Sequence, residues 1–409
     1  MKANLLSLAV AAVVAGQASI ASADLGSDIT DALKGGKAYG DFRLRYEMVD
    51  QDNAFNANGD KLKDADALTL RSRLGYITGD VHGVSATVEF EDSRVVAGMD
   101  DYNNTNGHNI DHSVIADPET TELDQGFIQY KNDLVTAKLG RQVITMDNHR
   151  FVGHVGWRQD RQTFDAGSFK LTPMKNLTAD YAYLMQRNRI FGEEKDIDSK
   201  DHLLNIGYKT PFGKATAYAY LLEEDNSSEK SYDTYGLRFA GKAEINSDLK
   251  ALYTVEYAQQ DFSEEGAEDR DADYINLEAG AEFMGVTAKL GYEVLGSDDG
   301  AYGFATPLAT LHKFNGWADQ FLGTPAQGLV DMSVSVSGKL AGVKLMAVYH
   351  EFEADEESNG VDDLGSELDL LVAKKFSENY SAGIKYAMYS EGDIKTDTDK
   401  GWLWVSAKF

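Results

Sequence analysis

The chain ends in the segment Trp402-Leu403-Trp404-Val405-Ser406-Ala407-Lys408-Phe409. Its apolar residues Leu403, Val405, Ala407 and Phe409 share one parity, and the polar residues Ser406 and Lys408 share the other. Such alternation predicts a β-strand with one apolar and one polar face. A strand in the last position leaves an open sheet edge unless it pairs with the first strand. The segment therefore predicts a strand that closes a sheet.

The same alternation recurs from Lys37 onward in segments of about ten residues. In the first of them, residues 42–48, Phe, Leu, Tyr and Met form one face, and two Arg and one Glu form the other. About ten alternating residues is the length that a tilted strand needs to cross a membrane. Strands of a soluble sandwich are usually shorter.

Eighteen strands of this kind are predicted. They lie near residues 37–48, 66–79, 84–93, 122–131, 134–142, 161–171, 176–187, 201–209, 214–223, 231–241, 248–259, 271–283, 286–295, 329–338, 343–353, 365–375, 380–390 and 400–409. Short links alternate with long polar links such as 49–65, 94–121 and 296–328. We therefore predict an all-β fold, a transmembrane antiparallel up-and-down barrel of about 18 strands, with short periplasmic turns and long external loops. A count of sixteen would preserve this alternation.

The amino terminus indicates export from the cytoplasm. Lys2, the apolar run 5–15 and the small residues 21–23 predict a signal peptide over residues 1–23. A short lead segment, residues 24–36, and a single barrel domain, residues 37–409, follow. The predicted location is the outer membrane after cleavage. The expected partners are its lipid and lipopolysaccharide, and the barrel-assembly machinery acting on the C-terminal strand.

Composition narrows the functional classes. The net charge of −28 argues against nucleic acid as a partner, and the absence of cysteine excludes disulfides and thiolate metal sites. The five prolines are expected between strands. Tyrosine and tryptophan pairs near strand ends, such as Tyr218 with Tyr220, are expected in interfacial aromatic girdles or reflect ordinary β-propensity.

Arginines are concentrated in the first part of the chain, where twelve of thirteen precede residue 240. Four of them, Arg43, Arg45, Arg71 and Arg73, have the parity of the polar face, which would line a lumen. Rings of arginine can select anions in pores. Acids such as Glu47 and Glu91 share that parity, so a lumenal ion-pair network is the alternative.

Two long links contain aromatic residues at a density that is unusual for solvated loops: residues 140–159 and 304–325. Both are expected to pack onto another part of the protein. They either narrow the lumen or plug it, and a wide barrel of this strand number needs narrowing to select solutes.

Three stretches resemble the alginate-export family of outer-membrane porins: Gly140-Arg141-Gln142, the run from Arg150-Phe151-Val152-Gly153 to Trp157-Arg158-Gln159, and Phe314-Asn315-Gly316-Trp317-Ala318-Asp319. The resemblance implies an eighteen-stranded monomer whose lumen is narrowed by inward loops and lined by arginines suited to anionic sugars. It also implies that Arg141, Arg150 and Arg158 lie at the constriction.

We expect a porin, a passive diffusion channel for small or oligomeric anionic solutes such as acidic sugars, without cofactor or bound metal. The alternatives are a general, weakly cation-selective porin and a plugged structural or adhesive barrel. Catalysis is not expected: His312 and four other loop histidines could be oriented by Asp165 or Asp319, but no hydrolase or metal-binding motif accompanies them. Acidic loops such as 261–273 could bind Ca²⁺ or remain a solvated surface.

Overall fold

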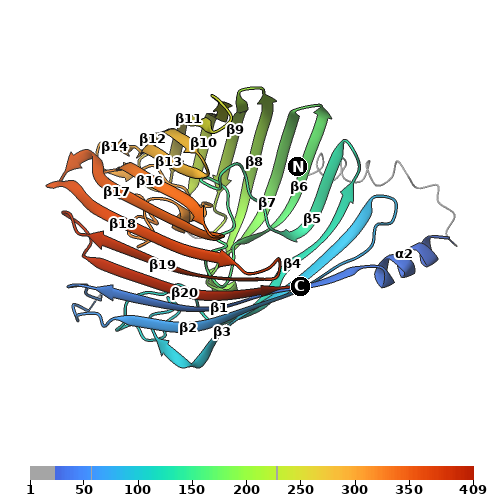
Figure 1. The fold of residues 1–409 in the computed structure, drawn as a ribbon, viewed down its shortest axis with the longest axis horizontal. Helices are drawn as coiled ribbons and strands as arrows, with labels where there is room; N and C mark the ends of the chain where they lie inside the picture. Colours follow the sequence, from blue (N-terminus) through green and yellow to red (C-terminus); the bar gives the residue numbers. More distant parts are fainter. Residues whose placement is uncertain (1–23, 57, 227–228) are drawn as a thin grey trace.

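The computed structural model describes residues 24–56, 58–226 and 229–409. The predicted signal peptide lies outside these residues. The lead segment contains the helix α2 (Asp24–Lys34), which precedes a closed antiparallel β-barrel (Figure 1). No helix in the described ranges is long and apolar enough to cross a membrane.

Eighteen strands form the barrel wall in sequence order, and each pairs antiparallel with the next. They are β1 (Lys37–Gln51), β2 (Ala65–Ile77), β3 (Val84–Asp101), β4 (Thr120–Lys131), β5 (Val135–Gln142), β6 (Thr163–Met174), β7 (Leu177–Asn188), β8 (Ile197–Thr210), β9 (Gly213–Glu223), β10 (Ser231–Glu244), β11 (Leu249–Ser263), β12 (Arg270–Phe283), β13 (Val286–Leu295), β16 (Leu329–Leu340), β17 (Val343–Ser358), β18 (Val361–Lys375), β19 (Tyr380–Ser390) and β20 (Thr398–Lys408). The predicted strand number and order are confirmed.

Small elements occupy the long connections. The short strands β14 (Ser297–Asp298) and β15 (Tyr302–Gly303) form a hairpin, and η1 (Glu193–Lys195) and η2 (Leu311–Lys313) are single 3₁₀ turns. Several wall strands, such as β3 and β17, run further toward the long loops than their alternation predicted.

The sheet closes where β20 pairs with β1, with Leu44 opposite Val405. Phe409 fixes one end of this seam: its backbone N–H donates to the Gly40 carbonyl (3.1 Å), and its ring stacks on Phe42 with centroids 6.1 Å apart. A Cβ on Gly40 would lie 2.4 Å from the Phe409 ring, so a larger residue here would displace that ring. The predicted role of the terminal strand is confirmed.

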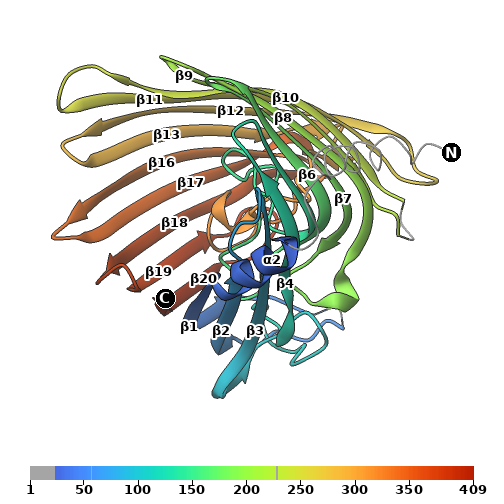
Figure 2. The ribbon, with the colours of Figure 1, turned by 90° about the vertical axis from the view of Figure 1, so that its right-hand side faces the viewer.

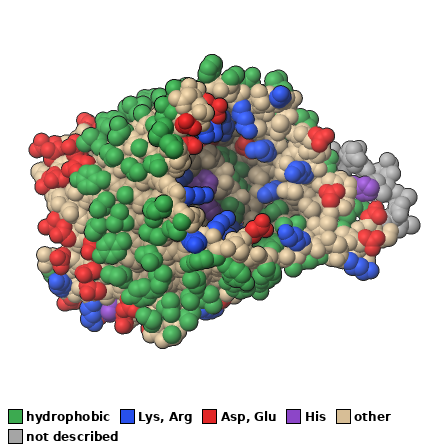
Figure 3. Space-filling model, viewed as in Figure 1, with side chains coloured by type: hydrophobic (Ala, Val, Ile, Leu, Met, Phe, Trp, Pro, Cys, Tyr) green, Lys and Arg blue, Asp and Glu red, His purple; other side chains and the backbone are tan. Residues whose placement is uncertain are grey.

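Alternation separates an apolar outer face from a polar inner one. On β16, Val334 and Val336 are about half exposed on the outer face, whereas Ser333, Ser335 and Ser337 face the interior. Figure 3 shows the resulting apolar cover along the outer wall. In hydrocarbon every backbone polar group must be paired, and closure of the sheet meets that requirement.

Two smaller predictions are wrong. Pro173 lies within β6, not between strands, but it falls in the gap of the ladder between Leu171 and Met174, where no amide is needed. Tyr218 and Tyr220 do not belong to an outer girdle. They point into the barrel and are 5% and 3% exposed, because loop residues pack on them.

Closure can be tested by cross-linking, since the natural chain has no cysteine. Leu44→Cys with Val405→Cys should form a disulfide in the membrane-inserted protein, because opposed strand residues lie about 5 Å apart. The disulfide would convert the chain into a covalent ring, and this ring should migrate differently from the linear, reduced chain on a denaturing gel. Leu44→Cys with Ala407→Cys is the control. If both pairs cross-link equally, the register is incorrect, since diagonal positions are about 7–8 Å apart.

Candidate functional site

Two long connections fold into the barrel and meet there. We name residues 143–162, between β5 and β6, inner loop A, and residues 304–328, between β15 and β16, inner loop B. Val152 forms a parallel bridge with Leu308, and the N–H of Gly153 donates to the Leu308 carbonyl at 2.7 Å. The Thr310 N–H donates to the His149 carbonyl at 3.0 Å. Figure 2 shows both loops enclosed by the wall.

Aromatic contacts hold inner loop A against two separate parts of the wall. The Phe151 ring packs on Tyr218 of β9 and Tyr274 of β12, with centroids 5.2 and 5.1 Å away. The Trp157 ring meets Trp402 and Trp404 of β20 edge-on, at 5.9 and 5.4 Å. The expectation that both loops pack onto the protein is confirmed, and the loop spans the lumen instead of covering its mouth.

The predicted arginines of β1 bind this loop. Arg43 donates to the carbonyls of Trp157 (2.7 Å) and Arg158 (2.5 Å) and to the Gln159 side chain (3.0 Å). Arg45 is fully buried; it donates to the Trp157 carbonyl and forms ion pairs with Glu47 (3.0 Å) and Asp117.

Arg158 joins the wall to inner loop B. Its Nη1 lies 2.9 Å from Glu47 Oε1, and its Nη2 lies 2.7 Å from Asp319 Oδ2. Arg150 makes the equivalent link on the other side, to Glu293 of β13 (2.8 Å) and to Asn315 (3.0 Å).

The remaining candidates pair within the wall. Arg71 lies 2.6 Å from Asp41, and Arg73 contacts Glu91. Arg141 lies apart from all of these. It occupies the outward parity with Leu139, and its guanidinium binds both oxygens of Asp165 at 2.8 and 3.1 Å. The structure thus gathers Arg43, Arg45, Arg150 and Arg158 at the inner loops, with Arg71 and Arg73 beside them on β2, and leaves Arg141 outside.

Together with their carboxylate partners, these arginines form a cluster that is nearly neutral. Six of the seven arginines face carboxylates. Arg43 is the exception, since within the described residues its guanidinium donates to backbone carbonyls and to a side-chain amide. A buried charge without a partner is costly, so the pairs fix the loops more than they create a field. The ion-pair network left open by the sequence is therefore present.

A second cluster contains His312, Asp319 and Lys385, of which only the first two were singled out from the sequence. His312 Nδ1 lies 2.7 Å from Asp319 Oδ1, and its Nε2 lies 2.6 Å from Lys385 Nζ. Lys385 Nζ also lies 3.7 Å from the centroid of Trp317 and 4.5 Å from that of Trp157.

Burial lowers the pKa of His312 to about 3, although Asp319 opposes the shift. The neutral ring can therefore donate from Nδ1 and accept from the lysine at Nε2. A general base needs a free Nε2, so this His–Asp pair is arranged for loop attachment. Lys385 carried no signal in the sequence, because a single lysine on a strand is ordinary.

Asp160 of inner loop A is buried against Glu91 and Glu122. Burial raises the pKa of its carboxyl well above the usual value, and the two glutamates raise it further. Neither of its oxygens accepts a hydrogen bond from a donor in the described part of the chain. A protonated Asp160 can instead donate to these glutamates.

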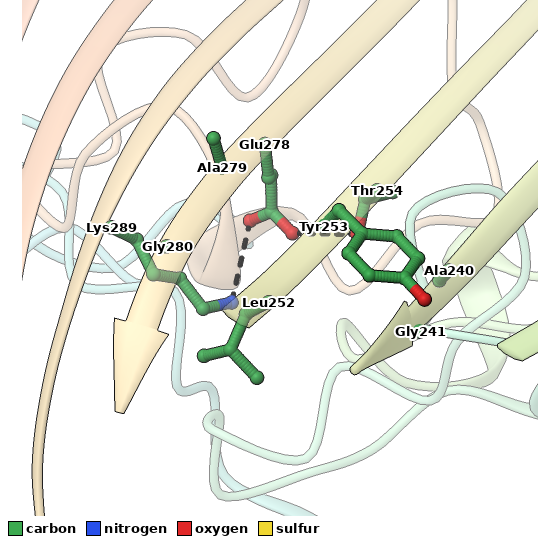
Figure 4. Close-up of a pocket in the computed structure, with 9 residues that line it drawn as sticks. All are labelled: Ala240, Gly241, Leu252, Tyr253, Thr254, Glu278, Ala279, Gly280 and Lys289. Carbon is green, nitrogen blue, oxygen red and sulfur yellow. Dashed lines mark hydrogen bonds and ion pairs between the residues drawn. The ribbon is translucent and has the colours of Figure 1, made fainter. Parts of the chain in front are cut away.

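A pocket of about 110 Å³ lies in the wall between β10 and β13 (Figure 4). Its lumenal side carries Lys289, whose Nζ is 3.6 Å from Glu278, and Thr254, which donates to the same carboxylate at 3.0 Å. These polar groups satisfy one another. Among the described residues no group of three or more His, Asp or Glu could hold a metal ion.

Comparison with known proteins agrees with this architecture. The sequence model of the family described as alginate export matches residues 38–294. No curated protein sequence matches the chain.

Solved structures share the fold at low sequence identity. The chain is 15% identical to Acinetobacter baumannii OccAB3 (TM-score 0.72) and 15% identical to Pseudomonas aeruginosa OccK9, or OpdG (TM-score 0.69). In both cases the alignment covers 92% of this chain and 99% of the other.

Attachment of the loops is testable at Arg158. Arg158→Gln should leave Glu47 and Asp319 buried without a full counter-charge, at a cost of about 3–5 kcal/mol. We expect a lower midpoint of urea denaturation and noisier single-channel current. Arg141→Gln is the matched control, since a partly exposed pair contributes about 1 kcal/mol or less. Equal effects of the two substitutions would contradict the assigned role of Arg158.

The environment of Asp160 predicts that the stability of the folded barrel depends on pH. The folded protein favours the neutral carboxyl, whereas the unfolded chain ionises near pH 4, so this group reduces stability as the pH rises above about 4. Asp160→Asn should therefore increase the free energy of unfolding at pH 7 by about 1–2 kcal/mol and have little effect at pH 3. The measurement is the temperature at which the barrel unfolds in detergent, which should rise at pH 7. Asp133→Asn, in an exposed turn, controls for loss of charge. A destabilised Asp160→Asn at pH 7 would contradict protonation.

Proposed function

The chain belongs to the alginate export family, and from this premise we propose that it is an outer-membrane passive diffusion channel for small or oligomeric anionic solutes such as acidic sugars. Solutes would cross through the lumen without a chemical step or an energy source. The apolar outer face would contact membrane lipid and lipopolysaccharide, and the C-terminal strand would be read by the assembly machinery.

One observation carries the proposal: the two inner loops are fixed across the bore of the barrel, and the sequence of this barrel matches the alginate export family. An eighteen-stranded barrel is wide enough for an aqueous channel, and selection of solutes requires a narrower passage. Contacts on β1, β9, β12 and β20 hold inner loop A in place, so the aperture would be constant over time. Figure 3 shows a hollow in the molecular surface with Lys and Arg side chains around it.

Within this proposal the arginines have two roles. Arg45, Arg150 and Arg158 set the shape of the constriction through their ion pairs. Arg43 would add positive charge there, because its bonds to carbonyl groups leave its charge uncompensated by a direct ion pair. Arg71 and Arg73 would support it on the neighbouring strand, whereas Arg141 would stabilise the wall near its outer face.

A general, weakly cation-selective porin is the second candidate. It is favoured by the carboxylates that neutralise most of these arginines and by the net charge of −28. In that case the loops would still set the size limit, and the charge preference would come from the acids.

Planar-bilayer recordings of the purified wild-type protein distinguish these candidates. In a KCl gradient we expect a reversal potential that favours Cl⁻ over K⁺, and galacturonate should carry current when it replaces Cl⁻. A channel that prefers K⁺ and excludes galacturonate would support the second candidate. No conductance above the leak of the bilayer would instead indicate that the inner loops plug the barrel.

A further inference from the structure

Lysines recur at the ends of the strands beside the short turns. Six of them occupy the lumen-facing parity within two residues of a strand end, and all six are exposed: Lys131, Lys209, Lys242, Lys339, Lys344 and Lys375. They come from β4, β8, β10, β16, β17 and β18, so they are spread around the circumference of one mouth. Three other lumenal lysines pair with an acid: Lys170 and Lys289, which lie further along their strands, and Lys250, which lies one residue from the start of β11 at the same mouth.

The arrangement carries an electrostatic cost. Lys339 lies directly opposite Lys344 in the ladder, and Lys209 lies directly opposite Lys214. Like charges in such positions destabilise a sheet. Lys214 is neutralised by Asp147 of inner loop A, at 2.7 Å. No ion pair or hydrogen bond of the six side chains is found within residues 24–56, 58–226 and 229–409. Among the described residues the Lys339–Lys344 pair is left without such a counter-charge, and a ligand that supplies negative charge would remove its cost.

Acids are placed differently. Glu282 lies one residue from the end of β12 at this mouth and pairs with Lys250. Other acids of the turns and strand ends there do not pair with the six lysines in the described part of the chain: Asp80, Asp133, Glu244, Asp248 and Glu378. Acid-rich segments such as 261–273 and 351–357 lie at the opposite end, beside the long loops. In Figure 3, Lys and Arg predominate around the hollow, with a few Asp and Glu among them, whereas Asp and Glu predominate along the left-hand end.

We propose that the short-turn mouth is an anion-binding vestibule for oligomers that carry several carboxylates, an inference that rests on the proposed function. A single small anion could contact one pair such as Lys339 and Lys344, whereas lysines on six strands can act together only on a longer, multiply charged chain. Exposed ammonium groups attract such a ligand and raise its rate of entry by electrostatic steering. Most of the buried arginines do not serve this purpose, because carboxylates compensate their charge, and Arg43, the exception, is bound to inner loop A inside the lumen.

The vestibule would therefore favour entry of oligomeric anions from the short-turn side, while the acidic long-loop side would disfavour it. The constriction formed by the inner loops would then admit or reject these anions according to their size. Anion capture and size selection would thus reside in different residues of the same lumen. The substrate class that fits this mouth is an acidic oligosaccharide instead of a monovalent inorganic anion.

The test uses the full-length barrel in planar bilayers of neutral phosphatidylcholine, with trigalacturonate as the probe. Asn359→Cys, in the turn between β17 and β18, reports orientation through one-sided labelling by a membrane-impermeant thiol reagent. Lys339→Gln/Lys344→Gln/Lys375→Gln removes three vestibule charges. Lys61→Gln/Lys195→Gln/Lys374→Gln is the matched control: residues 61 and 195 lie in long loops, and Lys374 has the outward parity beside Lys375.

In the parent channel, trigalacturonate should interrupt the current more often when it is added to the short-turn side. The vestibule variant should lower that association rate about tenfold at low salt, whereas the control should not change it. Monogalacturonate should show a much smaller difference between the two variants.

Equal rates in the two variants, in a parent channel that prefers anions, would overturn the vestibule and leave the proposed function intact. A sidedness that appears only after anionic lipid is added would also overturn it, since the lysines would then serve lipid headgroups. A parent channel that prefers K⁺ and is not interrupted from either side would contradict the proposed function itself.

Discussion

The structure depends on the pairing of β20 with β1. Hydrocarbon offers no hydrogen bonds to a peptide group, so a sheet can cross a membrane only when its last strand pairs with its first. This single seam, with Leu44 opposite Val405 and Phe409 bonded to Gly40, gives β1 and β20 their second neighbour, so that every strand of the wall is paired on both sides. Closure also fixes the two faces, because side chains alternate between lipid and lumen. The outer apolar cover and the polar interior are consequences of the same period of two.

A closed wall of eighteen strands creates a second problem, a bore that is too wide to discriminate among solutes. The chain solves it with two loops that enter the lumen and bind each other and the wall. Polar anchors in such a place need counter-charges. Arg45 and Arg158 meet Glu47, Asp117 and Asp319, so arginine acts here as a connector between segments far apart in sequence. Apart from Arg43, charge that is free to act on a solute must then lie elsewhere, and we propose that the exposed lysines of the short-turn mouth supply it.

Sequence patterns predicted the wall well because its signals are local. Residues 42–48 and 402–409 reveal their inner and outer faces by alternation alone, and the short links show where the chain turns back. The interior was less predictable. The acids that pair with Arg158 lie 111 and 161 positions away, and no local pattern indicates them.

Density of aromatic residues correctly indicated that residues 140–159 pack on something, but not that Tyr218 and Tyr274 receive Phe151. Arg141 has the same parity as Leu139 in the sequence, and the structure places it on the outward face, against the implication of the family resemblance. The mouth lysines carried the same alternation signal. Their significance became visible only when the partners of the other cations were known.

The most direct test of this account asks which side chains of one strand meet water. Because the chain has no cysteine, Ser335→Cys and Val334→Cys of β16 can be compared in intact outer membranes with a small, membrane-impermeant thiol reagent. The account predicts fast labelling of the cysteine at position 335, which faces the lumen, and none at position 334, which faces lipid. Labelling of position 334 with protection of position 335 would mean that the polar face is not an aqueous bore, and the account would be incorrect.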